Sequence, residues 1–225
     1  MGGTLEVRQE QITLQAHFAK PVFGLLRDVP QLAEHLFEGL GSYGVRLVDF
    51  QVDSAGDTLG EVNLRISLQH LVTVRVFLDR VDLASTYPPF LFDYRDSSFT
   101  ADFLGLIQAY SSDVSFRAFA ITREVHGRLD FPVQDVLNRF SAGAPRSLGP
   151  LLGSGTVFYY GAAENHLTGS LALDFSRVVE EGLFLKMAVL YDSTQVEARD
   201  FMTTSQEQFS SLVEEIGLEL TRRSV

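Results

Sequence analysis

The segment GEVNLRISLQHLVTVRVFLDRVD, residues 60–82, alternates apolar and polar side chains at every second position. This period is typical of a β-strand with one buried face and one solvated face. The alternation is interrupted at Gln69-His70-Leu71, so the sequence predicts a tight antiparallel pair formed by residues 60–69 and 71–82. The apolar positions expected to face the core are Val62, Leu64, Ile66, Leu68, Val72, Val74, Val76 and Leu78.

Strands with the same alternation are expected on both sides of this pair. Two precede it and four follow it, and each has one apolar and one polar face. One-sided strands of this kind are typical of an antiparallel sheet whose apolar face is covered by helices. The expected ranges are Ile12–Phe18, Val45–Asp53, Ser115–Phe131, Thr156–Gly161, Leu167–Ser176 and Leu183–Asp192.

Apolar residues at helical spacing predict four helices between and after the strands. Asp28 and Gln31 have the spacing of a capping box at the start of the first helix, and Thr194 and Glu197 have it before the last. The last helix would be roughly 39 Å long at 1.5 Å per residue. The helices are expected over residues 28–41, 99–110, 132–140 and 197–222.

The order strand, helix, three strands, helix occurs twice along the chain. Residues 64–67 resemble residues 173–176, and residues 76–79 resemble residues 189–192, at offsets of 109 and 113 residues. The sequence therefore predicts an α+β fold. Its antiparallel sheet would be built from two similar halves, 1–112 and 113–225, with the long C-terminal helix packed on the sheet. Convergent patterning of two unrelated halves is the alternative.

Two arrangements of this sheet stay open. One is a saddle of two fused halves, as in the TATA-binding protein. The other is a helix-grip sheet wrapped around the C-terminal helix. Both are likenesses of fold and imply no function.

The chain has 225 residues, no cysteine and a formal charge of −11. The absence of cysteine excludes disulfides, thiolate metal sites and cysteine nucleophiles. An acidic surface repels phosphates, so nucleic acid is not expected as a partner. The sequence shows no signal-peptide pattern and no apolar run of about 18 residues, which predicts a cytoplasmic protein without a membrane span.

Motifs of the common catalytic classes are missing from the sequence. It contains no phosphate-binding loop with a lysine, no H-E-x-x-H and no G-x-S-x-G. Glu124, His126 and Asp130 share the polar face of one expected strand and could ligate a metal, but this spacing is common by chance. We therefore expect no metal and no cofactor. A non-catalytic role is favoured, although an enzyme is not excluded.

The polar face of the expected sheet is the candidate binding surface. It gathers charged residues from several strands, and Phe77 stands among them as a large aromatic side chain. Arginine and aromatic residues are enriched at the centres of interfaces. Cover of this face by the loops at 84–98 and 141–155 is the alternative. The expected partner-binding residues are His17, Arg65, Arg75, Phe77, Asp79, Glu124, His126 and Arg128.

Two functions of different classes follow from the sequence. The first is a non-catalytic protein-interaction module, an adaptor, chaperone or assembly factor. It would bind another protein, or a second copy of itself, through the polar sheet face and the loops. The second is a binder of a hydrophobic small molecule in a cavity between the sheet and the C-terminal helix, favoured by the 18 phenylalanines. A tightly packed interior would contradict the second function.

Overall fold

Ten strands form one sheet in this computed structural model, which describes residues 3–53, 58–68, 72–87, 95–140, 155–161, 168–193, 197 and 200–222. The strand order is β2-β3-β4-β5-β1-β6-β9-β8-β7, and β10 pairs with β1. The strands are β1 (Gly3–Phe18), β2 (Phe50–Asp53), β3 (Asn63–Leu68), β4 (Val72–Val76), β5 (Arg80–Tyr87), β6 (Phe116–Leu129), β7 (Thr156–Gly161), β8 (Thr168–Phe175), β9 (Gly182–Asp192) and β10 (Leu218–Thr221). The helices are α1 (Val29–Gly39), α2 (Arg95–Tyr110), α3 (Val133–Leu137) and α4 (Phe201–Glu215), with 3-10 turns η1 (Gly41–Tyr43), η2 (Leu47–Asp49) and η3 (Leu59–Glu61).

β1 and β6 are the long central strands, and they run antiparallel to each other. Leu14 of β1 lies opposite Ile121 of β6, and both side chains are buried. Alternate residues of a strand point to opposite faces, so the apolar half of each strand faces the helices and the polar half faces away from them. The predicted α+β class and the large antiparallel sheet are confirmed.

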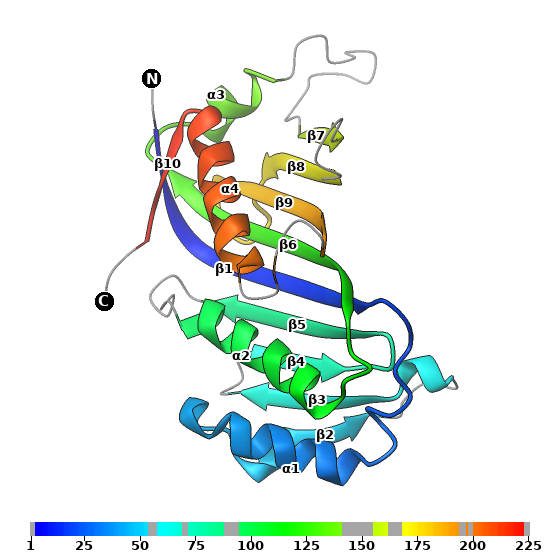
Figure 1. Cartoon of the computed structure of the whole chain (residues 1–225). Coiled ribbons are helices and arrows are strands. Elements are labelled where there is room, and N and C mark those ends of the chain that lie inside the picture. Colours follow the sequence, from blue (N-terminus) through cyan, green and yellow to red (C-terminus); the bar gives the residue numbers. More distant parts are fainter. Residues whose placement is uncertain are drawn as a thin grey trace.

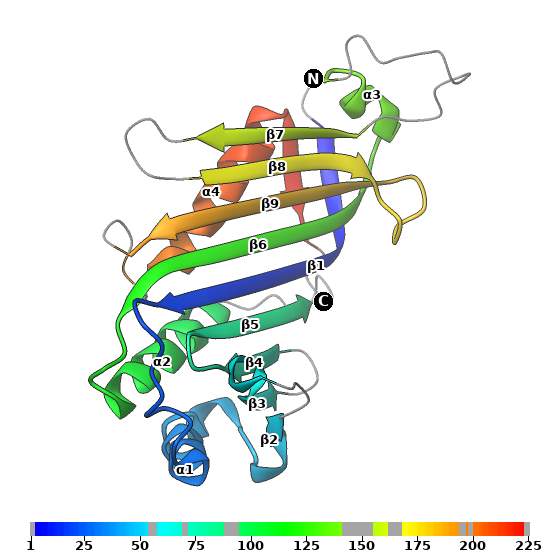
Figure 2. The ribbon, with the colours of Figure 1, turned by 90° about the vertical axis from the view of Figure 1, so that its right-hand side faces the viewer.

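The long helices lie on one face of the sheet (Figure 1). α1 and α2 cover the half that contains β2 to β5, and α4 covers the other half. Figure 2, turned by 90°, shows α4 behind β8 and β9. Phe119 of β6 stacks on Phe201 of α4 with ring centroids 5.0 Å apart. α4 therefore lies against one half of an open sheet, and the helix-grip arrangement is not observed.

Three of the predicted helices can be compared with the observed ones. The backbone N–H of Gln31 donates to Asp28 Oδ1 at 3.1 Å, so Asp28 caps α1 as the spacing predicts. α2 contains the predicted range 99–110. The predicted range 132–140 is helical only at Val133–Leu137.

Three predicted strands differ from the observed ones. β1 begins at Gly3, whereas the sequence predicts a start at Ile12. The prediction starts too late because the polar residue Glu10 occupies an inward position and interrupts the apolar pattern. The range 71–82 is divided between β4 and β5 by a turn in which the Phe77 N–H donates to the Arg80 carbonyl at 2.9 Å. In the range 45–53 only residues 50–53 form a strand, β2, and η2 precedes it.

The C-terminal helix is shorter than predicted, and a strand follows it. α4 ends at Glu215, and Gly217 has φ +78°, a left-handed conformation that glycine adopts at low cost. The chain then turns back as β10, which runs parallel to β1 with Leu218 opposite Gly3. Leu220, which lies at helical spacing from Ile216, therefore belongs to a strand rather than to the helix.

Some predicted features lie outside the described residues. They are the turn at 69–71 with His70, residues 88–94 of the loop at 84–98, most of the loop at 141–155 and the cap residue Thr194. No helix among the residues that are described is long and apolar enough to cross a membrane.

The facing assignments of β3 can be tested by removing core volume. Leu64 is 1% exposed, so Leu64→Ala is expected to lower the free energy of unfolding by about 2–5 kcal/mol, since it deletes buried methyl groups and leaves a cavity. Val178 is 56% exposed, and Val178→Ala is the control, expected within about 0.5 kcal/mol of wild type. Urea denaturation measures both, and equal midpoints for Leu64→Ala and wild type would contradict the assignment.

Candidate functional site

A β-bulge in β1 determines which side chains meet at one end of the sheet. The register with β6 shifts between Val7 and Gln9. Val7 is buried before the shift, and Glu10 is buried after it, so the alternation changes phase. The intervening Arg8 is half-buried and Glu10 is directed into the apolar interior, which is how a bulge re-aims side chains.

Glu10 holds two arginines from different parts of the chain. Its carboxylate accepts a hydrogen bond from Arg123 Nη1 of β6 at 2.9 Å. Arg222, which follows β10, donates to Glu10 Oε2 from Nε at 3.3 Å and from Nη2 at 3.1 Å. Glu10 and Arg123 are each only 1% exposed. A carboxylate buried this deeply is stable only with such charged partners.

α4 supports Arg123 from the helical side. Arg123 Nη1 also donates to Gln206 Oε1, and Gln206 Nε2 donates to Ser210 Oγ at 3.2 Å. The guanidinium lies 5.4 Å from the centroid of the Phe209 ring, a favourable position for a cation. The helix and the three strands β1, β6 and β10 therefore meet at one ionic cluster.

The cluster of Glu10, Arg123 and Arg222 contains two guanidinium groups and one carboxylate. Burial is the main influence on the pKa of Arg123 and lowers it, whereas the charge of Glu10 raises it and that of Arg222 lowers it. Arg123 Nε is buried and has no hydrogen-bond partner in the described part of the chain. One carboxylate is therefore shared by two guanidinium groups.

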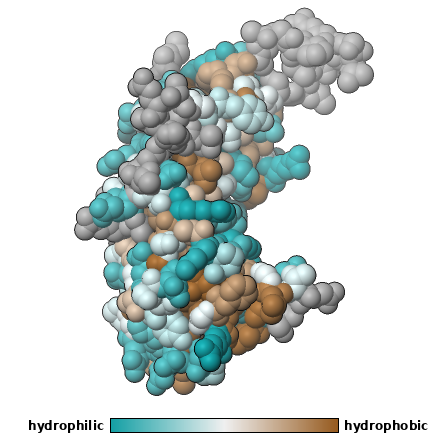
Figure 3. Space-filling view, turned by 45° about the vertical axis from the view of Figure 1, so that its right-hand side comes forward, coloured by the Kyte–Doolittle hydropathy of each residue, from teal (hydrophilic) through white to brown (hydrophobic). Residues whose placement is uncertain are grey.

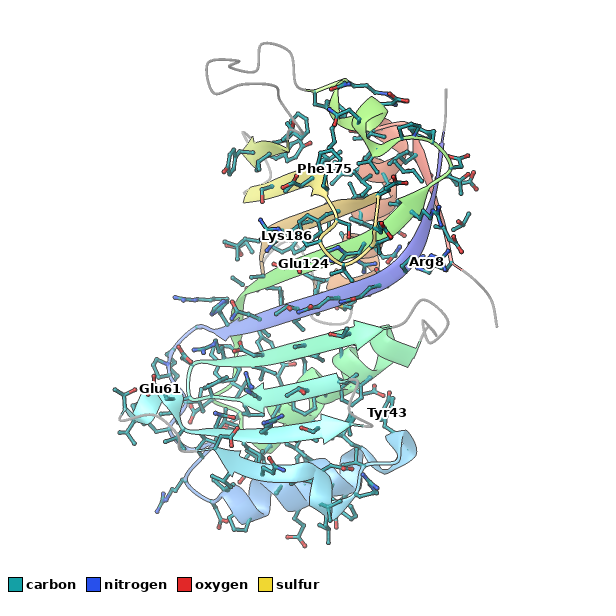
Figure 4. All side chains as sticks on the ribbon, turned by 180° about the vertical axis from the view of Figure 1, so that it is seen from behind. Arg8, Tyr43, Glu61, Glu124, Phe175 and Lys186 are labelled. Atoms are coloured by element: carbon teal, nitrogen blue, oxygen red, sulfur yellow. The ribbon has the colours of Figure 1, made fainter. Side chains whose placement is uncertain are left out.

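A hollow of about 620 Å³ lies beside this cluster. It opens where β10 pairs with residues 3–6 of β1 and β5 pairs with residues 10–17, so residues 7–9 lie between the ends of two neighbouring strands. Figure 4 labels Arg8 at this end of β1. The lining residues of the hollow are Thr4, Glu6, Arg8, Arg128, Leu129, Asp130, Thr221 and Arg222.

The three arginines of the hollow differ in their partners. Arg8 Nη2 donates to Glu6 Oε2 at 2.6 Å, and Arg222 is bound to Glu10. Arg128 is exposed, and it makes no hydrogen bond or ion pair with the residues that the structure describes. Arg128 is therefore the arginine of the hollow whose guanidinium is available to a ligand.

The arrangement is suited to binding rather than to a recognisable reaction. Guanidinium groups bind phosphate or carboxylate through two parallel hydrogen bonds. Glu6 and Asp130 lie in the same lining as hydrogen-bond acceptors, and Asp130 Oδ1 accepts from the Thr4 N–H at 3.2 Å. A ligand with one anionic group and several hydroxyl or amino groups matches this set of side chains.

Three of the predicted partner-binding residues lie on β6, on the open face of the sheet. Glu124 forms an ion pair with Lys186 of β9 at 2.8 Å, and both are labelled in Figure 4. His126 Nδ1 lies 2.9 Å from Ser176 Oγ, and burial lowers the pKa of His126. Arg128 is the member of the predicted set that lines the hollow.

Three others lie on strands of the first half. Arg65 and Arg75 are directly opposite each other on β3 and β4, and Arg75 is exposed. His17 lies at the end of β1, where burial and the charge of Arg117 lower its pKa. None of these three lines the hollow.

Phe77 and Asp79 belong to the turn between β4 and β5. Phe77 is 7% exposed, and the guanidinium carbon of Arg80 lies 4.1 Å from its ring centroid. Phe77 is therefore not the exposed aromatic residue that the sequence predicts, because Arg80 covers its ring. Asp79 Oδ1 accepts a hydrogen bond from Arg80 Nη1 at 3.1 Å.

Apolar surface gathers away from the hollow. Figure 3 shows an apolar area in the lower part of the molecule. Phe23, Leu47, Val48 and Leu59 are 66–74% exposed and lie on the connections of the first half. The polar lining of the hollow and this apolar surface are therefore separate features.

The row of Glu124, His126 and Asp130 on β6 does not form a coordination group. Glu124 is paired with Lys186, whereas Asp130 accepts the Thr4 N–H. No group of three histidine or carboxylate ligands is found in the part of the chain that the structure describes.

A small space lies between the sheet and helices α2 and α4 in the part of the chain that the structure describes. A space of about 10 Å³ is found there, which is about the volume that one water requires and far below about 300 Å³ for an organic ligand. The predicted binder of a hydrophobic small molecule between the sheet and the C-terminal helix is therefore wrong. The space is lined by Ile12, Val72, Leu83, Ser85, Phe99, Thr100 and Met202.

The sequence prediction misses Glu10, Arg123 and Arg222. Arg123 stands between Ile121 and Val125 at an inward position of the alternation, so a charge on the apolar face is visible in the sequence. Charged residues are almost never fully buried unless they are paired, which makes such a position a signal for an ionic partner. Arg222 gives no signal, since its place depends on β10.

Comparison with protein-family models and with curated proteins finds no match. Among solved structures, the chain is similar to a rolling circle replication initiator protein from Geobacillus stearothermophilus. The similarity covers 95% of this chain and 85% of the initiator, with a TM-score of 0.36 and 11% sequence identity. A likeness at this level assigns no activity to the present chain.

This neighbour nevertheless contradicts two expectations from the sequence. A replication initiator is related to nucleic acid, whereas the sequence predicted a non-catalytic protein-interaction module and no nucleic-acid partner. Both expectations are withdrawn. The physical weakness of the second is that a total charge of −11 does not describe each part of a surface, since three arginines line one hollow.

The ionic cluster can be tested by removing its central arginine. Arg123→Met is expected to lower the free energy of unfolding by about 3–5 kcal/mol, because the buried carboxylate of Glu10 loses a charged partner. Arg75→Met removes an exposed arginine of another strand and is expected within about 0.5 kcal/mol of wild type. Denaturant unfolding measures both. Similar small effects of the two substitutions would show that the cluster does not stabilise the fold.

Alkaline titration tests the packing of α4 on β9. Burial raises the pKa of Tyr191 to about 12, and its hydroxyl donates to Gln208 Oε1. An unfolded tyrosine has a pKa of about 10, so the unfolded state releases this proton first and stability is lost between about pH 10 and 12. Tyr191→Phe is expected to reduce this loss in unfolding curves measured across that range. Tyr159→Phe, at an 83% exposed residue, is expected to leave it unchanged, and equal curves for all three proteins would contradict the burial of Tyr191.

Proposed function

We propose that this protein binds a ligand that carries a phosphate group, in the hollow between β1, β6 and β10. The observation that carries the proposal is Arg128, an exposed guanidinium without a partner in the described chain, in one lining with Arg8 and Arg222. Arginine binds phosphate oxygens through two parallel hydrogen bonds, which supplies both affinity and orientation.

Three arginines in one lining support an anionic ligand. Arg8 and Arg222 bind Glu6 and Glu10, so Arg128 is the arginine that supplies a guanidinium for an incoming anion. The chain as a whole repels anions, with a formal charge of −11, and the lining itself contains Glu6 and Asp130 beside its three arginines, so the attraction for an anion is local to Arg128.

The acidic and hydroxyl residues of the lining support a polar organic ligand rather than a bare ion. Glu6, Asp130, Thr4 and Thr221 can accept hydrogen bonds from hydroxyl or amino groups attached to the phosphate. A phosphorylated metabolite, such as a nucleotide, and the phosphate of a nucleic-acid strand share this chemistry. The hollow is the binding site in either case, and the experiment below separates the two sources.

We also infer that the two halves, 1–112 and 113–225, arose by duplication. The strand order β1-β5-β4-β3 is matched by β6-β9-β8-β7. This match pairs β3 with β7, and not with residues 173–176 that resemble it in sequence, so it is the strand order and not that resemblance that supports duplication. Gln11 lies opposite Glu124, 113 residues later, and the same interval separates Glu10 from Arg123. If a twofold axis relates the two halves, equivalent residues of β1 and β6 lie next to each other where the axis passes between these strands. In the described chain β2 and β10 have no counterpart, so the hollow beside β10 belongs to one half only.

The proposal is tested by Arg128→Gln. The substitution removes the free guanidinium, so affinity for a nucleoside monophosphate is expected to fall about tenfold, the loss of roughly one charged hydrogen-bond pair. Isothermal titration calorimetry with inorganic phosphate, a nucleoside monophosphate and a short single-stranded oligonucleotide measures the effect. Tighter binding of the nucleoside monophosphate by the wild-type protein would indicate a phosphorylated metabolite as the ligand, and tighter binding of the oligonucleotide would indicate a nucleic-acid strand.

The matched control is Arg75→Gln, which removes an exposed arginine from the other half of the sheet. It is expected to bind like wild type. Absence of binding for all three ligands, or an equal loss in Arg75→Gln and Arg128→Gln, would overturn the proposal. Far-ultraviolet circular dichroism is the check that both variants are folded.

A further inference from the structure

We infer that Glu10 is a positioning residue of the hollow: the buried carboxylate fixes the guanidinium of Arg222 in the lining. The inference rests on the proposed phosphate binding and explains how Arg222, one of the arginines that line the hollow, is oriented. Glu10 is 1% exposed and does not line the hollow, so it would act only through Arg222.

Arg222 requires an orienting partner because of its place in the chain. It follows β10, a strand of four residues whose ladder partner is β1. A free arginine side chain has many rotamers, and ordering it on ligand binding would weaken affinity. Donation from both Nε and Nη2 to Glu10 Oε2 restricts the guanidinium before a ligand arrives.

Glu10 is itself held rigidly enough to orient another residue. Arg123 donates to it at 2.9 Å, and Arg123 is in turn held by Gln206 and by the ring of Phe209 on α4. The order of contacts from the helix to the hollow is therefore Gln206, Arg123, Glu10 and Arg222. Supporting contacts of this kind position the residues that touch a ligand.

Stability alone does not account for this cluster. A buried ion pair is often no more stabilising than apolar residues of similar volume, because both charges lose their hydration. β1 also contains a bulge that turns Glu10 inward and Arg8 outward. One local irregularity thus supplies both an arginine of the hollow and the carboxylate that orients a second arginine.

The first test requires no ligand. In wild-type protein labelled with ¹⁵N, the side-chain Nε–H of Arg222 is expected to be protected from exchange by its hydrogen bond to Glu10. Glu10→Gln removes the negative charge, and exchange is expected to become at least about tenfold faster. Unchanged exchange in folded Glu10→Gln would overturn the inference, whatever the protein binds.

The second test is a double-mutant cycle on affinity for a nucleoside monophosphate. Glu10→Gln is expected to weaken binding about tenfold in wild type and in Arg128→Gln, but to have no effect in Arg222→Gln, because Glu10 acts through Arg222. Equal losses in all three backgrounds would show a merely structural role and overturn the inference. Arg128→Gln could weaken binding of the nucleoside monophosphate while Glu10→Gln and Arg222→Gln show no coupling. That result would leave the proposed function standing and refute only this inference.

A variant outside the interior covers the case in which Glu10→Gln does not fold. Arg222→Lys keeps the charge but cannot form the planar fork with Glu10. Its affinity is expected to fall to that of Arg222→Gln. Wild-type affinity in Arg222→Lys would show that charge alone is sufficient, and would overturn the positioning role of Glu10.

Discussion

The buried carboxylate of Glu10 is the constraint on which one half of the structure depends. It binds Arg123 of β6 and Arg222 after β10, and through Arg123 it reaches Gln206 of α4. A carboxylate that is 1% exposed must have charged partners, because its hydration is lost. Two central strands, the C-terminal helix and the C-terminal strand are therefore joined at one point, and their relative positions are not independent.

The bulge in β1 is what makes this point possible. Strict alternation would turn Glu10 to the solvated face, but the register shift between Val7 and Gln9 turns it inward. The same shift lies between the ends of β10 and β5, beside the hollow lined by Arg8, Arg128 and Arg222. The ion pair, the bulge and the hollow are thus parts of one local arrangement. In it the buried carboxylate of Glu10 is joined to Arg222, which lines the hollow.

The polar face of the sheet contains charged residues that are largely satisfied by one another. Glu124 is paired with Lys186, and Asp79 with Arg80. Local pairing leaves few of these groups to a ligand, whereas Arg75 and Arg128 have no hydrogen-bond or ion-pair partner in the described chain. Arg128 is the one of these two that lines the hollow, so contacts and position together narrow the predicted binding residues to one arginine.

Alternation in residues such as Leu64, Ile66, Val74 and Val76 determined the antiparallel sheet from the sequence alone, because period-two burial has no other common explanation. The inward charge of Arg123 was also visible there. The sequence did not determine β10, since Leu220 continues the helical spacing of Leu212 and Ile216 as well as it alternates in a strand. Only the tertiary structure decided that Gly217 turns the chain back along β1 and brings Arg222 to Glu10, because this contact joins residues 212 positions apart. Local pattern fixes which side of an element is buried, but partners so distant in sequence are chosen by packing.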